Sequence, residues 1–595
     1  MGAGDEADAR PLLLAEEPSS SGDISPLLAS LRLFSCGQVD DSAFPPGAEE
    51  GELLPALLHP YRNPERVRQD YPLFLAPGGE RPCLPLSELL EELLKAAAPG
   101  AEEARVLKDN LARLERRVRD EIEPGIASVE ARECLLRASR AMEEELELDV
   151  ESAARLQGDT AAMLRGLPEG GRLLPLSEET FIPLLVHAAR ERLIGRWALF
   201  RAEIESLCGA RQALLDLEDS QAPEAREARS LRESVGSAGA GRIDAEALAS
   251  VLGPSRGSAR MTPERRHRIE GVLETLRGGL ESGEEPRVTI IHEGSLAATA
   301  TDLGEDPGVD PLACWRGVEA EAPCARAAEL FDEEAARHAS LCAAVRVAKL
   351  EVAGGFDPER HQPFLTAFNW EAFSREELLL MSPLVAIAPV ESLAGDGMAE
   401  LSSLIRSGRP VKVLVAVQPA VNPGAGEDPA AGCRFELGYL GISHREALVV
   451  QSSAARPEHL VTGFLRAMDA TRVTLLVTST GLTAGGERPR VGSWLEVGAA
   501  LEGRAHPFFI YDPEAGRTWA RRMEFTGNPH PELDWPLYDL EYRAEGRRAE
   551  TLSLAFTFAD YALLEPSCSH HFRAIPPGCP AGDLLDLADY LDLDG

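Results

Sequence analysis

Between residues 434 and 480, hydrophobic and polar positions follow a strand, helix, strand pattern. Residues 447–450 and 473–477 are compact apolar runs that predict two buried strands. Pro457 and Glu458 fit the first turn of a helix, because proline lacks only an N–H that has no partner there. An apolar stripe at helical spacing follows, formed by Leu460, Val461, Phe464, Leu465 and Met468. The pattern predicts a βαβ unit.

The same alternation runs through the rest of the C-terminal half from residue 365. Strands are expected at 384–390, 411–417 and 508–511, and helices at 397–408, 434–444, 457–469 and 491–503. Apolar strands separated by amphipathic helices indicate a parallel sheet covered on both faces. We therefore predict an α/β fold with a largely parallel, Rossmann-like sheet, in which the strand after Pro410 lies next to or near the strand after Pro383.

A mainly α-helical region precedes this sheet. Helical periodicity runs from residue 87 to 218 and indicates several packed antiparallel helices. Further stripes span 126–147, 149–165 and 178–217, and another helix is expected at 325–352. One predicted helix face carries Leu107, Leu111, Leu114, Val118 and Ile122.

Composition along the chain sets the expected domain boundaries. We predict a disordered acidic tail at 1–24, a mainly helical domain at 25–218 and a Gly- and Ser-containing linker at 219–242. A helical connecting region follows at 243–364, with an isolated strand at 286–293. The α/β domain occupies 365–535. Residues 536–595 form a hairpin around Glu545 and Gly546, a helix at 558–564 and an acidic tail.

Charge and cysteine content narrow the functional classes. The 595 residues include 98 acidic and 60 basic side chains, a formal net charge of −38, which disfavours nucleic acid and anionic membranes as partners. The N-terminus lacks a secretory pattern and the apolar runs are too short to span a bilayer, so we expect a soluble cytoplasmic protein. No two of the ten cysteines form Cys-x-x-Cys, so no iron–sulfur cluster is expected.

Some polar residues outside the apolar pattern carry possible chemistry. His444, beside Arg445 and Glu446, is a candidate for binding an anion or ligand at the sheet edge, with a structural histidine as the alternative. Ser453 and Ser479 follow strands but lack the Gly-x-Ser-x-Gly context of a hydrolase nucleophile. The cysteines and histidines between 568 and 579 do not follow a zinc-finger or zinc-ribbon spacing.

Three stretches of this half carry a family resemblance. They are ELGYLGISHREA at 436–447, QSSAARPEHL at 451–460 and HPFFIYDPEAG at 506–516. Over roughly residues 365–575 the chain resembles the thiamine-diphosphate-binding domain of pyruvate and other 2-oxoacid:ferredoxin (flavodoxin) oxidoreductases.

The resemblance implies where a cofactor would bind. In that family a Gly-Asp-Gly segment at one strand end and an asparagine-containing loop after the next strand hold the Mg²⁺ that grips the diphosphate. The corresponding residues here include Val390 in place of the aspartate, which leaves Glu391 and Asn422 as the candidate metal ligands. A Gly-Asp-Gly at 395–397 falls later, near the start of a helix. The resemblance implies these candidate cofactor-binding residues: Asn422, Gly424, Gly426 and His444.

Two functional hypotheses follow from this resemblance. The first is a degenerate relative, non-catalytic or dependent on a partner, that binds neither thiamine diphosphate nor Mg²⁺. The alternative is a working subunit that oxidatively decarboxylates a 2-oxoacid and passes electrons to separate iron–sulfur proteins. The family's cofactor also requires a glutamate from a separate pyrimidine-binding domain, which the helical N-terminal half does not supply. Other oxidoreductase subunits or a second copy of this chain are therefore the expected partners.

Overall fold

The computed structural model describes residues 71–78, 81–100, 104–122, 128–177, 180–221, 227–252, 261–281, 287–294, 311–419, 436–479, 493–543 and 549–564. The chain divides into two compact units. The first comprises Met1–Arg192, Arg287–Ala328 and Pro383–Gly595, and the second comprises Leu193–Pro286 and Glu329–Ser382.

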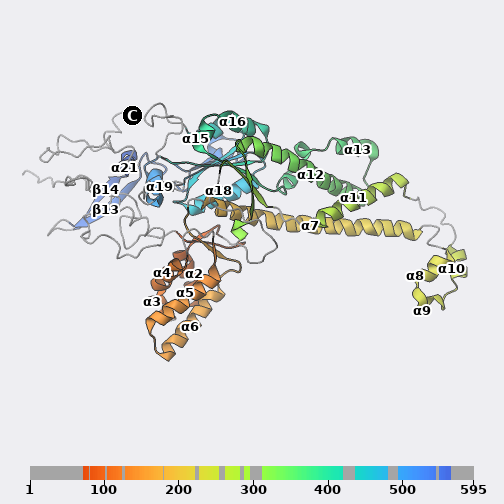
Figure 1. The fold of residues 1–595 in the computed structure, drawn as a ribbon, viewed down its shortest axis with the longest axis horizontal. Helices are drawn as coiled ribbons and strands as arrows, with labels where there is room; N and C mark the ends of the chain where they lie inside the picture. Colours follow the sequence, from red (N-terminus) through yellow and green to blue (C-terminus); the bar gives the residue numbers. More distant parts are fainter. Residues whose placement is uncertain are drawn as a thin grey trace, which may run out of the picture. The chain divides into compact units, whose positions relative to one another are not determined.

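Helices dominate the N-terminal part of the first unit (Figure 1). They are α2 (Leu86–Ala97), α3 (Arg105–Asp109), α4 (Leu111–Asp120), α5 (Ala131–Leu146) and α6 (Val150–Arg165). All five contribute to one apolar core, so the predicted bundle is confirmed for these helices. The N-terminus of α6 is fixed by Asp149, whose carboxylate accepts hydrogen bonds of 3.0 Å from the backbone N–H groups of Glu151 and Ser152.

The apolar face predicted between 107 and 122 is divided between two helices. Leu107 lies on α3, whereas Leu114 and Val118 lie on α4, and all three side chains enter the same core. The helices are separated by Asn110, whose side-chain amide donates a 2.8 Å hydrogen bond to the Val106 carbonyl oxygen. Such a side-chain bond competes with the regular backbone pattern, which explains the break.

A small antiparallel sheet in this region was not predicted. Its strands are β1 (Leu73–Leu75), β2 (Leu84–Pro85), β3 (Val129–Glu130) and β4 (Arg172–Leu174), in the order β2-β1-β4-β3. Each has two or three residues, too few to show a period of two. Their pairing therefore depends on contacts between distant segments rather than on local pattern.

An eight-stranded, mostly parallel sheet organises the rest of the first unit. Its order is β12-β11-β9-β10-β8-β7-β5-β6. Four central strands agree with the predicted ones: β7 (Leu384–Pro389), β8 (Lys412–Ala416), β9 (Leu448–Ser453) and β10 (Thr474–Ser479). β7 pairs with β8 and β9 with β10, both in parallel. The predicted neighbouring strands and the βαβ unit are confirmed.

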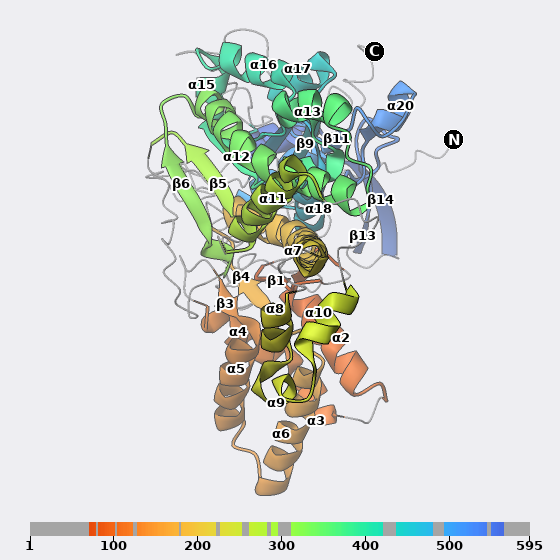
Figure 2. The same ribbon diagram turned by 90° about the vertical axis from the view of Figure 1, so that its right-hand side faces the viewer.

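The two sides of the sheet depart from the prediction in different ways. β11 (Phe509–Tyr511) pairs antiparallel with β9, and β12 (Met523–Glu524) pairs antiparallel with β11. On the other side, β5 (Val288–His292) lies beside β6 (Trp315–Glu319), as Figure 2 shows. β5 pairs in parallel with both β6 and β7. The strand predicted at 286–293 is confirmed as β5. The expectation that this strand is isolated was wrong, because its partners lie in separate segments that local periodicity does not connect.

Helices cover both faces of the sheet, as a parallel sheet requires. On α17 (Leu437–His444), a Cβ at Gly441 would come within 2.8 Å of Val449 and 2.9 Å of Leu475. On α18 (Pro457–Asp469), a Cβ at Gly463 would lie 2.5 Å from Val450. Because successive strand residues point to opposite faces, α17 and α18 pack on opposite sides of β9.

The remaining helices of this part are short. They are α15 (Val390–Ala394), α16 (Met398–Ser407), α19 (Ser493–Glu502), α20 (Trp519–Arg522) and α21 (Phe558–Leu564). The predicted C-terminal hairpin is confirmed as β13 (Leu537–Arg543) and β14 (Ala549–Ala555), although its turn lies outside the described residues (Figure 1). The predicted helix at 558–564 is confirmed as α21.

The second unit is helical. It includes α7 (Phe181–Gln221) from Leu193 onward and α12 (Pro323–Val352) from Glu329 onward. Its other helices are α8 (Ala228–Ser234), α9 (Gly236–Ala240), α10 (Ala245–Leu252), α11 (Pro263–Glu281), α13 (Pro358–Thr366) and α14 (Arg375–Leu378). The apolar contacts that hold it together join α7, α11 and α12.

The region predicted as a linker, 219–242, is partly helical. α7 extends to Gln221, and both α8 and α9 fall inside the region. Yet α8 has no buried residue. Helix formation there gains little from tertiary packing, so these helices should open at low cost.

A glycine substitution tests the packing of α18 on β9. Gly463→Ala should lower the free energy of unfolding by about 1–3 kcal/mol, because its methyl group overlaps the buried Val450 side chain. Gly158→Ala, in α6 with open space around the position, should instead stabilise by about 1 kcal/mol through helix propensity. Urea unfolding measures both, and equal effects at the two positions would contradict the proposed packing.

Limited proteolysis tests the stability of the segment around α8. Trypsin should cut first within 219–242, where Arg229 and Arg232 have side chains that are 87% and 52% exposed. Mass spectrometry of the earliest fragments identifies the site. Initial cleavage inside α5 or α6, which contribute to the N-terminal core, would count against this arrangement.

Candidate functional site

The carboxyl ends of four parallel strands form one continuous edge. Pro389 of β7 pairs with Ala416 of β8, and Ser479 of β10 pairs with Ser453 of β9. β10 also pairs with β8, so the four strand ends follow one another. Ligands of open parallel α/β sheets bind at this type of edge, which makes it the first place to look for a site.

Glu391, a candidate metal ligand, lies at this edge. It occupies the first turn of α15 immediately after β7, and its side chain is exposed. Val390, where the family resemblance places an aspartate, is only 6% exposed. Asp396 is exposed in the turn before α16, next to the N-cap Gly397, which confirms its predicted position near the start of a helix.

The other candidates are not all brought to this edge. Asn422, Gly424 and Gly426 lie outside the described residues. His444 ends α17, four residues before β9 begins, which places it towards the amino edge of the sheet. Its Nε2 lies 3.3 Å from the Ser402 hydroxyl of α16. The structure therefore does not bring His444 together with Glu391.

Two strand-end serines line the carboxyl edge, and both are buried. Ser453 Oγ accepts a 3.3 Å hydrogen bond from the Ala455 backbone N–H and so shapes the turn into α18. Ser479 Oγ has no hydrogen-bond partner in the described part of the chain, while its backbone oxygen accepts a 2.9 Å bond from Ala454. Ser453 therefore has a structural role, and Ser479 presents an unused buried hydroxyl.

A histidine missed by the sequence analysis is more highly organised. Ser452 Oγ lies 2.8 Å from His459 Nδ1, and the Ser452 carbonyl oxygen lies 3.0 Å from His506 Nε2. The His459 ring stacks on Phe508, with centroids 4.9 Å apart and an interplanar angle of 22°. A Cβ at Gly527 would come within 3.2 Å of the imidazole. The imidazole thus packs closely against both Phe508 and Gly527.

Burial dominates the electrostatics of His459. Its residue is 9% exposed, and Nε2 has no hydrogen-bond partner among the described residues. Burial lowers the pKa of His459 to about 4, although the Glu524 carboxylate opposes this shift. Glu524 is itself engaged by Arg466, whose Nη1 lies 2.7 Å from its Oε2. The imidazole is neutral at neutral pH.

The Ser452–His459 pair has the components of an activated nucleophile but not the access. A hydroxyl beside a neutral imidazole can lose its proton to that base during attack. Ser452, however, is 0% exposed. In this arrangement the pair fastens the first turn of α18 to β9. In the sequence, Ser452 and His459 lie on either side of the predicted turn into a helix. This spacing is the signal from which their contact could have been predicted.

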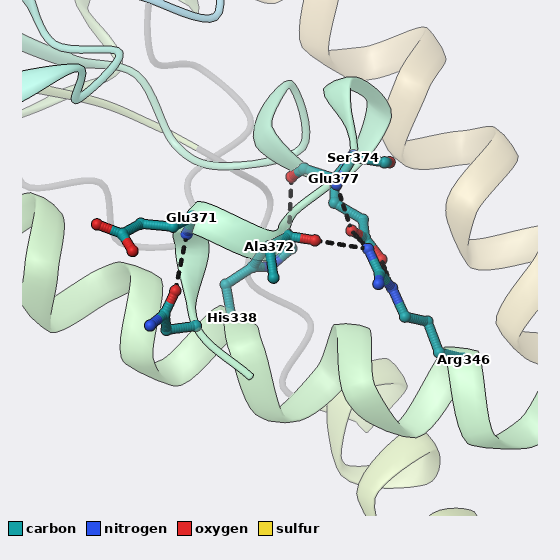
Figure 3. A network of polar contacts seen from close by, with 7 residues as sticks. His338, Arg346, Glu371, Ala372, Ser374 and Glu377 are labelled. Carbon is teal, nitrogen blue, oxygen red and sulfur yellow. Dashed lines mark hydrogen bonds and ion pairs between the residues drawn. The ribbon is translucent and has the colours of Figure 1, made fainter. Parts of the chain in front are cut away.

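The second unit holds a dense polar network between α12 and α14 (Figure 3). Arg346 binds Glu377 through Nε and Nη2, at 2.8 and 2.5 Å, and the Ser374 N–H donates to the same carboxylate at 2.7 Å. Burial opposes ionisation, but these bonds hold the pKa of Glu377 below its usual value. His338 Nε2 lies 3.1 Å from the Glu377 carbonyl oxygen. The network is a structural clamp.

The described ranges contain neither a metal-binding cluster nor a membrane-spanning helix. No group of three or more His, Cys, Asp or Glu side chains in them is placed to hold a metal ion. No helix formed by those residues is long and apolar enough to cross a membrane.

Comparison with known proteins does not identify a family. No protein-family model matches the chain, and no curated protein matches it.

The buried imidazole predicts a defined dependence of stability on pH. The folded-state pKa of His459, about 4, lies below the 6.5 of an unperturbed histidine, so the unfolded chain binds the proton first. Stability therefore falls as the pH is lowered from 6.5 to 4. His459→Gln should remove roughly 3 kcal/mol of this pH-dependent loss in the free energy of unfolding. Urea unfolding across the same pH range measures it. Ser452→Ala keeps the imidazole and should retain the dependence. An identical pH profile for wild type and His459→Gln would exclude this role.

Proposed function

We propose that this chain is a degenerate relative of the thiamine-diphosphate-binding domain of 2-oxoacid:ferredoxin oxidoreductases. In this proposal its C-terminal sheet keeps the framework of that domain without a working cofactor site. Its role is then non-catalytic, or depends on other oxidoreductase subunits or a second copy of the chain.

The pairing of β7 with β8 is the framework feature that supports this relationship. The family's diphosphate motif needs two neighbouring strand ends, one for an acidic segment and one for an asparagine-containing loop. Pro389 and Ala416 are paired at the ends of β7 and β8, so the segments after them start side by side. Glu391 follows the first strand, and Asn422 follows the second in sequence.

The burial of Val390 carries the proposal of degeneracy. Mg²⁺ prefers carboxylate, amide and phosphate oxygens, and a valine side chain offers none. Val390, the first residue after β7, is 6% exposed, whereas Glu391 is exposed to solvent. A buried valine at the position of the family's aspartate supports the loss of the magnesium–diphosphate site. The chain's net charge of −38 would add repulsion for an unscreened diphosphate.

The proposal predicts the response to cofactor. Thiamine diphosphate with Mg²⁺ should leave the melting temperature unchanged, because Val390 replaces the aspartate with which the resembled family helps to hold the metal. A bound ligand at one hundred times its dissociation constant would stabilise by about 2.7 kcal/mol, which differential scanning fluorimetry detects.

A paired variant distinguishes specific binding from a salt effect. If the cofactor and Mg²⁺ raise the melting temperature of the wild type but not of Asn422→Ala, the degenerate-site proposal is wrong. The working-subunit alternative then replaces it. Mg²⁺ with inorganic diphosphate serves as the control for non-specific anion effects.

A further inference from the structure

An arginine in the second unit is buried without a hydrogen-bond partner. Arg211 lies on α7 and is 0% exposed. None of its three guanidinium nitrogens makes a hydrogen bond among the described residues. One helical turn on, Leu215 packs with Ile269 and Leu273 of α11 in an apolar cluster. Arg211 therefore occupies a position where an aliphatic side chain would ordinarily lie.

The nearest opposite charge is already occupied. Glu351 of α12 is 3% exposed and accepts a 2.9 Å hydrogen bond from Arg265 Nε on Oε2. Arg268 Nε and Nη2 donate to Glu351 Oε1 at 2.9 and 2.6 Å. Arg211 is attracted by Glu351 and repelled by Arg265 without bonding to either. The cluster of Arg211, Arg265, Arg268 and Glu351 thus contains three guanidinium groups and one carboxylate.

Three guanidinium groups beside one carboxylate are energetically unfavourable without a further anion. A buried charge costs several kcal/mol unless it is paired and hydrogen-bonded. Burial lowers the pKa of Arg211, but a guanidinium stays protonated in proteins, so it cannot escape the cost by losing its proton. One carboxylate among three guanidinium groups leaves two positive charges uncompensated within the cluster.

We propose that this cluster is a binding site for a tetrahedral oxyanion of the phosphate type. Guanidinium groups carry the planar, paired donors that phosphate oxygens accept, and those of Arg211 have no hydrogen-bond partner among the described residues. Arg211 forms the buried wall, and Glu351 holds Arg265 and Arg268 in position. The Arg265 side chain is 38% exposed, so the anion enters from its side of the cluster.

The ligand is a small anion rather than a nucleic acid or an acidic protein surface. The donors that lack partners belong to Arg211, which is fully buried, so only a group small enough to pass Arg265 reaches them. The acidic chain also repels large polyanions over most of its surface. Free phosphate and the phosphate of a small monoester share this chemistry.

Thermal stability in the presence of phosphate tests the proposal. The full chain is melted with inorganic phosphate, with glycerol phosphate and with sodium chloride, all at matched ionic strength. Phosphate should raise the melting temperature of the wild type by about 2–4 °C relative to chloride. A response to phosphate alone indicates the free ion, and a response to both indicates a site open to monoesters.

Two variants test whether the phosphate-induced rise in melting temperature comes from binding at this cluster. Arg211→Met replaces the buried guanidinium by an apolar side chain of similar length and should abolish the phosphate response. Arg266→Met, on the same helix α11 as Arg265 but paired with Asp219 rather than Glu351, should retain it. If Arg211→Met does not fold, Arg268→Gln measures the same loss.

Two results would overturn the proposal. The first is a wild-type melting temperature that phosphate raises no more than chloride does. The second is a phosphate response that persists in Arg211→Met. If Arg211→Met is more stable than wild type and neither protein responds to phosphate, the cluster is a buried ionic core without a ligand.

Discussion

Parallel hydrogen bonding between β7, β8, β10 and β9 is the constraint on which the first unit depends. A parallel sheet needs apolar cover on both faces, and these strands are buried almost throughout. Gly441 and Gly463 let α17 and α18 approach opposite sides of β9 closely. The same pairing aligns the four strand ends, so the location of the candidate site follows directly from the packing of the core.

Local pattern was sufficient where a strand or helix is long and strongly apolar. The runs at 384–390 and 473–477 predicted β7 and β10, and Pro457 marked the start of α18. It was insufficient where pairing joins distant segments, as for β5 with β7 or for strands of two or three residues. At the candidate site, sequence placed Glu391 correctly after a strand. It could not place His444 at the opposite edge, because that depends on the direction of α17 across the sheet.

Three buried polar groups differ in how the energetic cost of their desolvation is met. Glu377 is satisfied by Arg346 and a backbone N–H, so its charge strengthens the second unit. His459 stays neutral at neutral pH because burial lowers its pKa. Arg211 can use neither solution, and the burial of its guanidinium group, unpaired among the described residues, is the basis of the proposed anion site.

The central functional proposal is a thiamine-diphosphate-type sheet whose diphosphate site is lost at the end of β7, where Val390 is buried. Isothermal titration calorimetry of thiamine diphosphate into the full chain, with Mg²⁺ present, tests it most directly. The proposal predicts only the heat of dilution, because Val390, where the resembled family has an aspartate, offers Mg²⁺ no oxygen ligand. Saturable binding of one cofactor per chain, lost when Mg²⁺ is removed, would contradict it.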